Sequence, residues 1–242
     1  MYGWRARLGI LVPSKNMAIE PEFERMAPDG VSCHYHRFAF SGAKTSDEAV
    51  SRLKMAEQFI GDGSEMLTHV GPNAMVVTGT GVSFIGGPDY DLGLIQKMKE
   101  RNGNLPTTTT STAVVEALRS MGITKLSIAM PYLEKVAKAG VKFIEGNGFQ
   151  VLNAKWLGKN SYEIPRVSEE AQYHLAREVD DPESEAVFIS CVDLHTLDLI
   201  EQLEDDLQKP VITSNQATMW HVLRLAGVRD RIDGLGRLFR EY

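Results

Sequence analysis

The feature that most constrains the fold is an alternation of strand-like and helix-like segments that runs through the chain twice. Short apolar runs alternate with longer amphipathic stretches, a pattern typical of a mostly parallel α/β sheet. The strand-like runs are RLGILVP, VSCHYHRF, AMVVTG, KLSIAMP, FQVLNAKWL, AVFISC and PVITS. The helix-like stretches are DEAVSRLKMAEQFIGDG, PDYDLGLIQKMKERNG, STAVVEALRSMG and NQATMWHVLRLAG, several of which end in glycine, as helices often do.

Three blocks of the first half recur in the second half in the same order. RLGILVPSKN corresponds to KLSIAMPYLE, AMVVTGTGVSF to AVFISCVDLHT, and LPTTTTSTAVVEALRSMGI to KPVITSNQATMWHVLRLAGV. We therefore expect an α/β fold of two similar parallel-sheet lobes related by pseudo-twofold symmetry, with an active-site cleft between them. Residues 1–112 with a C-terminal helix at about 215–242 would form the first lobe, and residues 113–214 the second. Ligands of open α/β sheets bind beyond the carboxyl ends of the strands, so the cleft would collect loops from both lobes.

The composition is that of a globular protein with a substantial core. Of 242 residues, 43% are hydrophobic and 24% are charged. The net charge of -6 and the lack of a basic stripe argue against nucleic acid or a membrane as partner. The apolar runs are far shorter than the roughly 20 residues of a membrane span, and MYGWRARLGI contains no signal-peptide core. We expect a cytoplasmic protein, for which oligomerisation stays open.

The chain contains two cysteines, Cys33 and Cys191, too few for a disulfide scaffold. No CxxC or HExxH spacing indicates a metal, and His34 and His36, on one face of a strand, are more typical of solvent-facing residues than of ligands. Cys33 is predicted to be a buried, inert thiol. Cys191 ends the AVFISC strand, and its counterpart in the first half is Gly79. The two halves would thus supply a pair of half-sites, one of which carries a thiol.

A set of short motifs links the chain to a known group. VPSKNMAIEPEF, GTGVSF, TTTSTA, MPYLEKV, SCVDLHTLD and the closing GLGRLF together resemble the aspartate/glutamate racemase superfamily. The resemblance covers essentially the whole chain and is to the branch that holds maleate cis-trans isomerases and arylmalonate decarboxylases. It implies an enzyme that needs no cofactor and acts on a small dicarboxylate or malonate-type substrate.

The resemblance also implies which reaction the residues of the two half-sites match. Isomerases and racemases of this superfamily typically carry one cysteine from each half, whereas arylmalonate decarboxylases keep the second-half cysteine and have glycine in the first. Gly79 and Cys191 match the decarboxylase pattern. Val192 departs from it, because those decarboxylases have glycine after the cysteine. PSKN, with Asn16, is closer to the PSSN of the isomerases, although Lys15 departs from that form.

The chemistry of the candidate residues can also be inferred without the family resemblance. We expect Cys191 to lie just before an amphipathic helix in VDLHTLDLIEQLEDDL, where the helix dipole would lower the thiol pKa. Such a thiol exchanges protons with a carbon acid, and an enediolate beside it needs preorganised donors and a dry site. Candidate donors are the hydroxyls of Thr80 and Tyr132 and the amides of Thr80, Gly81, Cys191 and Val192.

The candidate residues divide by role. Catalytic candidates are Cys191, Tyr132 and Thr80; substrate-binding candidates are Gly79, Gly81, Val192, Asn16, Ser14 and Thr196; no metal ligand is predicted. Asn16 and Ser14 would hold a second carboxylate. His195 is expected to be a half-exposed helix residue rather than the partner of the thiol. Ser111 or Thr112 is expected to cap the helix that follows TTTSTA.

The absence of a thiol in the first half makes some of the possible reactions more favoured than others. Racemisation needs a group on each face of the carbon, and maleate isomerisation, in the family's usual account, needs a nucleophile that Gly79 cannot supply. Decarboxylation needs one acid on one face. The first hypothesis is therefore a cofactor-independent decarboxylase of a substituted (aryl)malonate, in which Cys191 protonates an enediolate. The alternatives are a maleate cis-trans isomerase or Asp/Glu-type racemase, and a non-catalytic dicarboxylate-binding protein.

Overall fold

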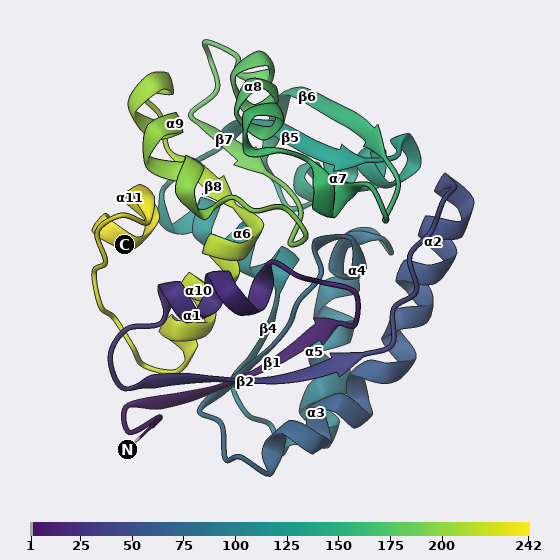
Figure 1. Ribbon diagram of the computed structural model, residues 1–242, viewed down its shortest axis with the longest axis vertical. Helices are drawn as coiled ribbons and strands as arrows, with labels where there is room; N and C mark the ends of the chain where they lie inside the picture. The colour runs from purple at the N-terminus through teal and green to yellow at the C-terminus, as the bar shows by residue number, and fades with distance from the viewer. Residues whose placement is uncertain (1) are drawn as a thin grey trace.

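The computed structural model describes residues 2–242, and within them the strands form two four-stranded parallel sheets (Figure 1). The first sheet has the order β2-β1-β3-β4 and the second has the order β6-β5-β7-β8. The strands are β1 (Ala6–Pro13), β2 (Val31–Phe38), β3 (Ala74–Val77), β4 (Thr107–Thr109), β5 (Lys125–Tyr132), β6 (Gln150–Lys159), β7 (Ala186–Ile189) and β8 (Val211–Thr213). The same strand order in both sheets confirms the prediction of two similar parallel α/β lobes.

The helices flank the two sheets and fill the region between them. They are α1 (Ile19–Met26), α2 (Ser46–Met55), η1 (Ala56–Phe59), α3 (Ile60–Thr68), α4 (Thr80–Phe84), α5 (Tyr90–Asn102), α6 (Thr110–Ser120), α7 (Glu134–Gly146), η2 (Ile164–Arg166), α8 (Glu169–Val179), η3 (Leu197–Leu199), α9 (Ile200–Leu207), α10 (Ser214–Leu225) and α11 (Gly236–Glu241). The pair α6 and α10 pack against each other, and each contacts strands of both sheets. The assignment of residues 1–112 with 215–242 to one lobe and 113–214 to the other stays a prediction.

The two central helices begin in the same way. Thr109 and Thr213 end equivalent strands and have extended backbones. The Thr109 side chain accepts a hydrogen bond from the backbone amide of Thr112, and the Thr213 side chain accepts one from that of Gln216. Such a cap contributes about 1 kcal/mol to helix stability. The prediction that Ser111 or Thr112 caps α6 is wrong, because the extended residue is Thr109 and the helix has already begun at the next residue.

The helix expected over residues 47–63 is interrupted by η1, after which α3 lies against β1 and β2. Gly63 permits this close approach. A Cβ at that position would lie 2.8 Å from Cδ2 of the His36 ring and 2.9 Å from Cδ2 of Leu11.

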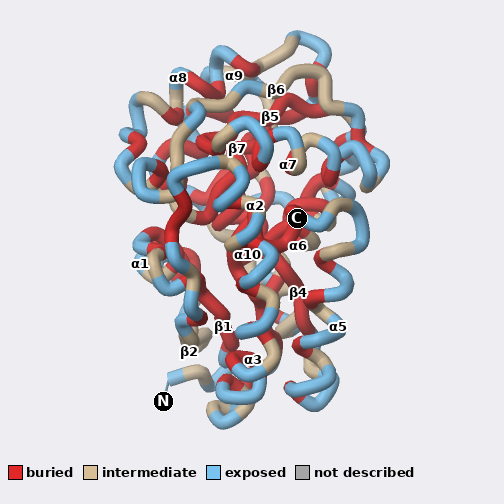
Figure 2. The backbone as a smooth tube through the Cα atoms, turned by 90° about the vertical axis from the view of Figure 1, so that its right-hand side faces the viewer, coloured by how far each residue is buried: buried red, intermediate tan, exposed pale blue. Residues whose placement is uncertain are grey.

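Burial follows strand position, as Figure 2 shows, with buried backbone running through the middle of both lobes. Every residue of β3 and β7 is buried, as expected for central strands of parallel sheets. Strand β2 lies at a sheet edge and is half-buried along most of its length. Cys33 is therefore half-buried, not buried as predicted. None of the helices within residues 2–242 has the length and apolar character needed to cross a membrane.

An aromatic cluster joins the two lobes. Phe84 of α4 packs edge-to-face against Tyr132 of β5, with ring centroids 5.9 Å apart, and against Phe143 of α7 at 6.5 Å. Gly140 leaves room for it, since a Cβ there would lie 3.3 Å from Cζ of Phe84. The buried Phe84 ring thus ties the first lobe to two elements of the second.

Truncation of this ring should destabilise the protein. We expect Phe84→Ala to lower the free energy of unfolding by about 3–5 kcal/mol, because a buried ring is replaced by a cavity. Urea unfolding followed by circular dichroism measures the change. Phe59→Ala is the control, since that residue is 39% exposed, and its effect should stay at about 1–1.5 kcal/mol. Equal losses in the two variants would contradict this description of the interface.

Candidate active site

A pocket lies where the carboxyl ends of strands from both lobes meet. Its lining residues are Pro13, Lys15, Phe40, Ala49, Leu53, Gly79, Thr80, Gly81, Val82, Tyr132, Leu133, Val136, Lys159, Ser161, Ile164, Cys191, Val192 and Asp193. Of the predicted site residues, this pocket brings together Cys191, Tyr132, Thr80, Gly79, Gly81 and Val192. Ser14, Asn16 and Thr196 are not among the residues that line it.

The two half-sites share an unusual backbone. Gly79, after β3, has a φ of 121°, and Cys191, after β7, has a φ of 148°. Glycine adopts such a conformation freely, whereas for a residue with a side chain it costs roughly 1–3 kcal/mol and must be held by its surroundings. Both lobes therefore have a residue with positive φ after the equivalent strand, and the thiol is carried by the residue for which this conformation is strained.

The environment of Cys191 makes the thiol a weak acid. The residue is 5% exposed, and burial raises the thiol pKa to about 12, with a further contribution from the nearby Asp193 carboxylate. The Asp193 amide donates to Sγ at 3.4 Å, which offsets this in part. The predicted lowering of the pKa by a helix dipole is wrong, because residues 192–196 are irregular and η3 begins only at Leu197. The thiol is consequently protonated at neutral pH.

Tyr132 provides a second protonated group in the pocket. Its hydroxyl lies 3.3 Å from Oγ of Ser190, and burial beside Cys191 raises its pKa well above the ordinary value. A neutral phenol is a hydrogen-bond donor. Tyr132 can therefore donate to an oxyanion that forms next to the thiol.

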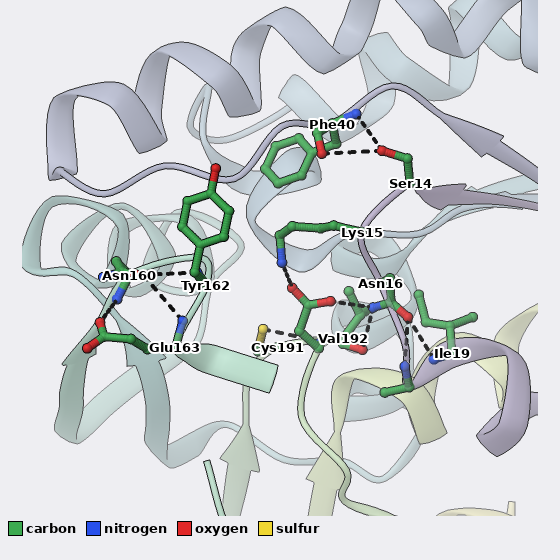
Figure 3. A network of polar contacts seen from close by, with 12 residues as sticks. Ser14, Lys15, Asn16, Ile19, Phe40, Asn160, Tyr162, Glu163, Cys191 and Val192 are labelled. Carbon is green, nitrogen blue, oxygen red and sulfur yellow. Dashed lines mark hydrogen bonds and ion pairs between the residues drawn. The ribbon is translucent and has the colours of Figure 1, made fainter. Parts of the chain in front are cut away.

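The loop that carries Cys191 is anchored by the first lobe (Figure 3). The amide of Asn16 donates to the Val192 carbonyl at 2.9 Å and to Oδ1 of Asp193 at 2.7 Å. Its oxygen accepts the backbone amides of Ala18 and Ile19, at 3.0 and 2.8 Å. The Asn16 side chain is thus engaged within the protein and holds the thiol loop, which differs from the predicted role of holding a substrate carboxylate.

Two of the charged residues that line the pocket, Lys15 and Asp193, interact with each other and were not predicted as site residues. Lys15 forms an ion pair with Asp193, and its ammonium lies 5.9 Å from the centroid of the Phe40 ring. Ser14 contributes to the same corner by accepting the Phe40 amide at 3.1 Å. No local sequence pattern points to the Lys15–Asp193 pair, because its members are 178 residues apart.

The far end of the thiol loop is held by a buried carboxyl that the sequence reading also missed. Oε1 of Glu22 accepts hydrogen bonds from the backbone amides of Thr196 and Leu197, at 2.8 and 3.2 Å.

Two other residues of this loop were considered as site residues. Within residues 2–242 the Thr196 hydroxyl has no hydrogen-bond partner. His195 is half-buried but does not line the pocket. His195 lies in the irregular segment, so the prediction that it is a helix residue is wrong.

The donor set of the pocket is suited to a small anion. Its lining within residues 2–242 includes the cations Lys15 and Lys159 and one carboxylate, Asp193. In the same part of the chain, no group of three or more His, Cys, Asp or Glu side chains is placed to hold a metal ion. The arrangement can bind an anion, donate hydrogen bonds to it and deliver one proton from sulfur.

Comparison with known proteins places this site in a family. The family described as arylmalonate decarboxylase matches residues 8–239. The chain is 29% identical to arylmalonate decarboxylase of Bordetella bronchiseptica over 238 residues, which cover 97% of this chain and 96% of that protein. It is 22% identical to maleate isomerase of Nocardia farcinica over 244 residues, covering 97% and 96%.

Solved structures agree in fold. The maleate isomerase of Pseudomonas putida S16 with maleate superimposes with a TM-score of 0.90 at 19% identity, covering 97% of each chain. A liganded glycine-to-cysteine, cysteine-to-serine double mutant of arylmalonate decarboxylase superimposes with a TM-score of 0.84 at 25% identity, covering 98% of this chain and 100% of that one. The homologues are thus a decarboxylase and cis-trans isomerases of the aspartate/glutamate racemase superfamily, and this protein is an enzyme of that superfamily, a lyase or an isomerase. The chain belongs to the arylmalonate decarboxylase family.

Proposed function

We propose that the protein decarboxylates a substituted malonate and that Cys191 protonates the resulting enediolate. The observation that carries the proposal is the pairing of one buried, protonated thiol with Gly79 in the other half-site. Gly79 has no side chain that could attack a double bond or move a proton. A site with one acid is suited to decarboxylation, whereas racemisation and isomerisation call for a second group.

The reaction balances with the residues present. The bond between Cα and one carboxylate breaks, carbon dioxide leaves, and the electron pair stays on Cα and spreads into the retained carboxylate as an enediolate. The thiol proton of Cys191 then moves to Cα. The thiolate regains a proton from water before the next turnover, so the net reaction consumes one proton and releases carbon dioxide.

The retained carboxylate would bind where hydrogen-bond donors converge. The amides of Thr80, Gly81 and Val82 form the first turn of α4, where no carbonyl of the helix can accept them, and these residues line the pocket. Together with the neutral Tyr132 hydroxyl they would stabilise the charge that develops on the enediolate oxygens. The predicted donors at the Thr80 hydroxyl and the Cys191 amide are directed to Ser214 instead.

The carboxylate that leaves would lie against the apolar part of the pocket. Leu53, Leu133, Val136 and Ile164 belong to this wall. A carboxylate is poorly solvated there, whereas neutral carbon dioxide is not penalised, so the surroundings favour the movement of negative charge from this carboxylate into the enediolate. Lys15 and Lys159, in the lining of a protein whose net charge is -6, would attract the doubly charged substrate.

Removal of the acid should stop the reaction. We expect Cys191→Ala to lower the rate of carbon dioxide release from phenylmalonate by roughly 100-fold or more, since the proton donor is lost. Cys33→Ala is the matched control, because that thiol lies on β2, outside the pocket, and should leave the rate unchanged. An active Cys191→Ala variant would contradict the proposal, and so would a wild-type protein that converts maleate to fumarate but releases no carbon dioxide from malonates.

The pH profile should distinguish an acid from a nucleophile. The protonated thiol is the active form, and its pKa is raised to about 12, so the rate should not fall through deprotonation until the pH approaches that value. We expect kcat for phenylmalonate, followed by its ultraviolet absorbance, to stay level between about pH 7 and 10. A rate that rises over this range, as a thiol of ordinary pKa ionises, would show that the thiolate is the active form.

A further inference from the structure

We propose that Ser214 is a positioning residue, which fixes the backbone of Cys191 and the hydroxyl of Thr80 for the protonation step. The inference rests on the proposed function. Ser214 is the first residue of α10, is fully buried and does not line the pocket. Its Oγ accepts the Cys191 amide at 3.0 Å and the Thr80 hydroxyl at 2.9 Å. One hydroxyl therefore joins the thiol residue of the second lobe to the substrate-facing turn of the first.

The hydrogen bond between the Cys191 amide and Ser214 holds a residue whose backbone is strained. With a φ of 148°, Cys191 keeps its backbone only because neighbouring groups hold it there. Loss of the Ser214 hydroxyl would leave the Cys191 amide buried without an acceptor, a costly state that a rotation of the peptide would relieve. Such a rotation would move Sγ, and a displacement of about 1 Å at a reacting atom can cost 100-fold in rate.

The bond to Thr80 places a second group of the pocket. The Thr80 hydroxyl donates to Ser214, while the Thr80 carbonyl accepts the hydroxyls of Ser83 and Ser111, at 3.2 Å each. These bonds hold Thr80, and with it the first amides of α4, at a set distance from Cys191. Donors that are already oriented need no reorganisation when charge develops on the substrate.

The pseudo-symmetry of the fold supplies a matched control. Thr110 is the first residue of α6, and its Oγ1 accepts the Gly79 amide at 3.2 Å, as Ser214 accepts that of Cys191. The Thr218 hydroxyl links the two positions, because it donates to Oγ1 of Thr110 and lies 2.6 Å from the Ser214 carbonyl. The same bond is thus made at both half-sites, but at Thr110 it fixes a glycine that carries no reacting group.

The test compares Ser214→Ala with Thr110→Val, and uses Ser214→Thr to restore the hydroxyl. For phenylmalonate we expect Ser214→Ala to lower kcat by roughly 10- to 100-fold with KM changed less than about threefold. Thr110→Val should keep kcat within about threefold of wild type, and Ser214→Thr should recover most of the loss. Equal losses in Ser214→Ala and Thr110→Val, or an unchanged kcat in Ser214→Ala, would overturn the proposal.

A second measurement does not depend on turnover. Amide hydrogen exchange, followed by NMR, should speed up at Cys191 by at least about 10-fold in Ser214→Ala, and at Gly79 but not at Cys191 in Thr110→Val. Unchanged exchange at Cys191 in Ser214→Ala would show that Ser214 does not hold this residue and would refute the inference. A wild-type protein that releases no carbon dioxide from any malonate would refute the proposed function, and the exchange data would then decide separately whether Ser214 fixes Cys191.

Discussion

The site depends on a turn with positive φ that the fold makes twice, once after β3 and once after β7. In the first lobe Gly79 occupies this turn without strain. In the second lobe Cys191 occupies it at a cost, and its conformation is kept by the hydrogen bond that its own amide donates to Ser214 and by the one that Asn16 donates to the Val192 carbonyl. The strained turn places the thiol at the junction of the two lobes and fixes the direction in which it points.

The position of the turn also sets the protonation state of the thiol. A helix N-terminus would favour the thiolate, but the loop after Cys191 is irregular and the residue is buried, so the neutral form is favoured. Tyr132, buried beside it, is neutral for the same reason. The pocket therefore holds two protonated groups and a turn of free amides next to an apolar wall. This combination suits a carbanion that must be stabilised and then protonated once.

The sequence was sufficient for the fold because the repeat is carried by local pattern. Each of the three matched blocks contains a strand and its following turn or helix, so their order predicts two sheets of the same topology, as observed. The pairing of Gly79 with Cys191 follows from the same correspondence, and both residues line the pocket. What local pattern predicted poorly was the loop between residues 192 and 196, where the amphipathic spacing suggested a helix.

That loop is shaped by contacts from distant parts of the chain. Glu22, Asn16 and Lys15 hold it from positions more than 170 residues away, through bonds to Thr196, Val192 and Asp193. Nothing in the segment VDLHT reveals these partners. The pKa of Cys191 was predicted in the wrong direction because burial outweighs the effects of its sequence neighbour Asp193, whose carboxylate raises the pKa and whose amide lowers it.

Protonation of one face of the intermediate by a single fixed thiol is tested most directly by the stereochemistry of the product. The substrate would be α-methyl-α-phenylmalonate, whose decarboxylation creates a chiral carbon, and the product would be resolved by chiral chromatography. The expected result is release of carbon dioxide and one enantiomer in large excess. Racemic product from the enzymatic reaction would contradict it, because a proton delivered from both faces requires a donor other than Cys191.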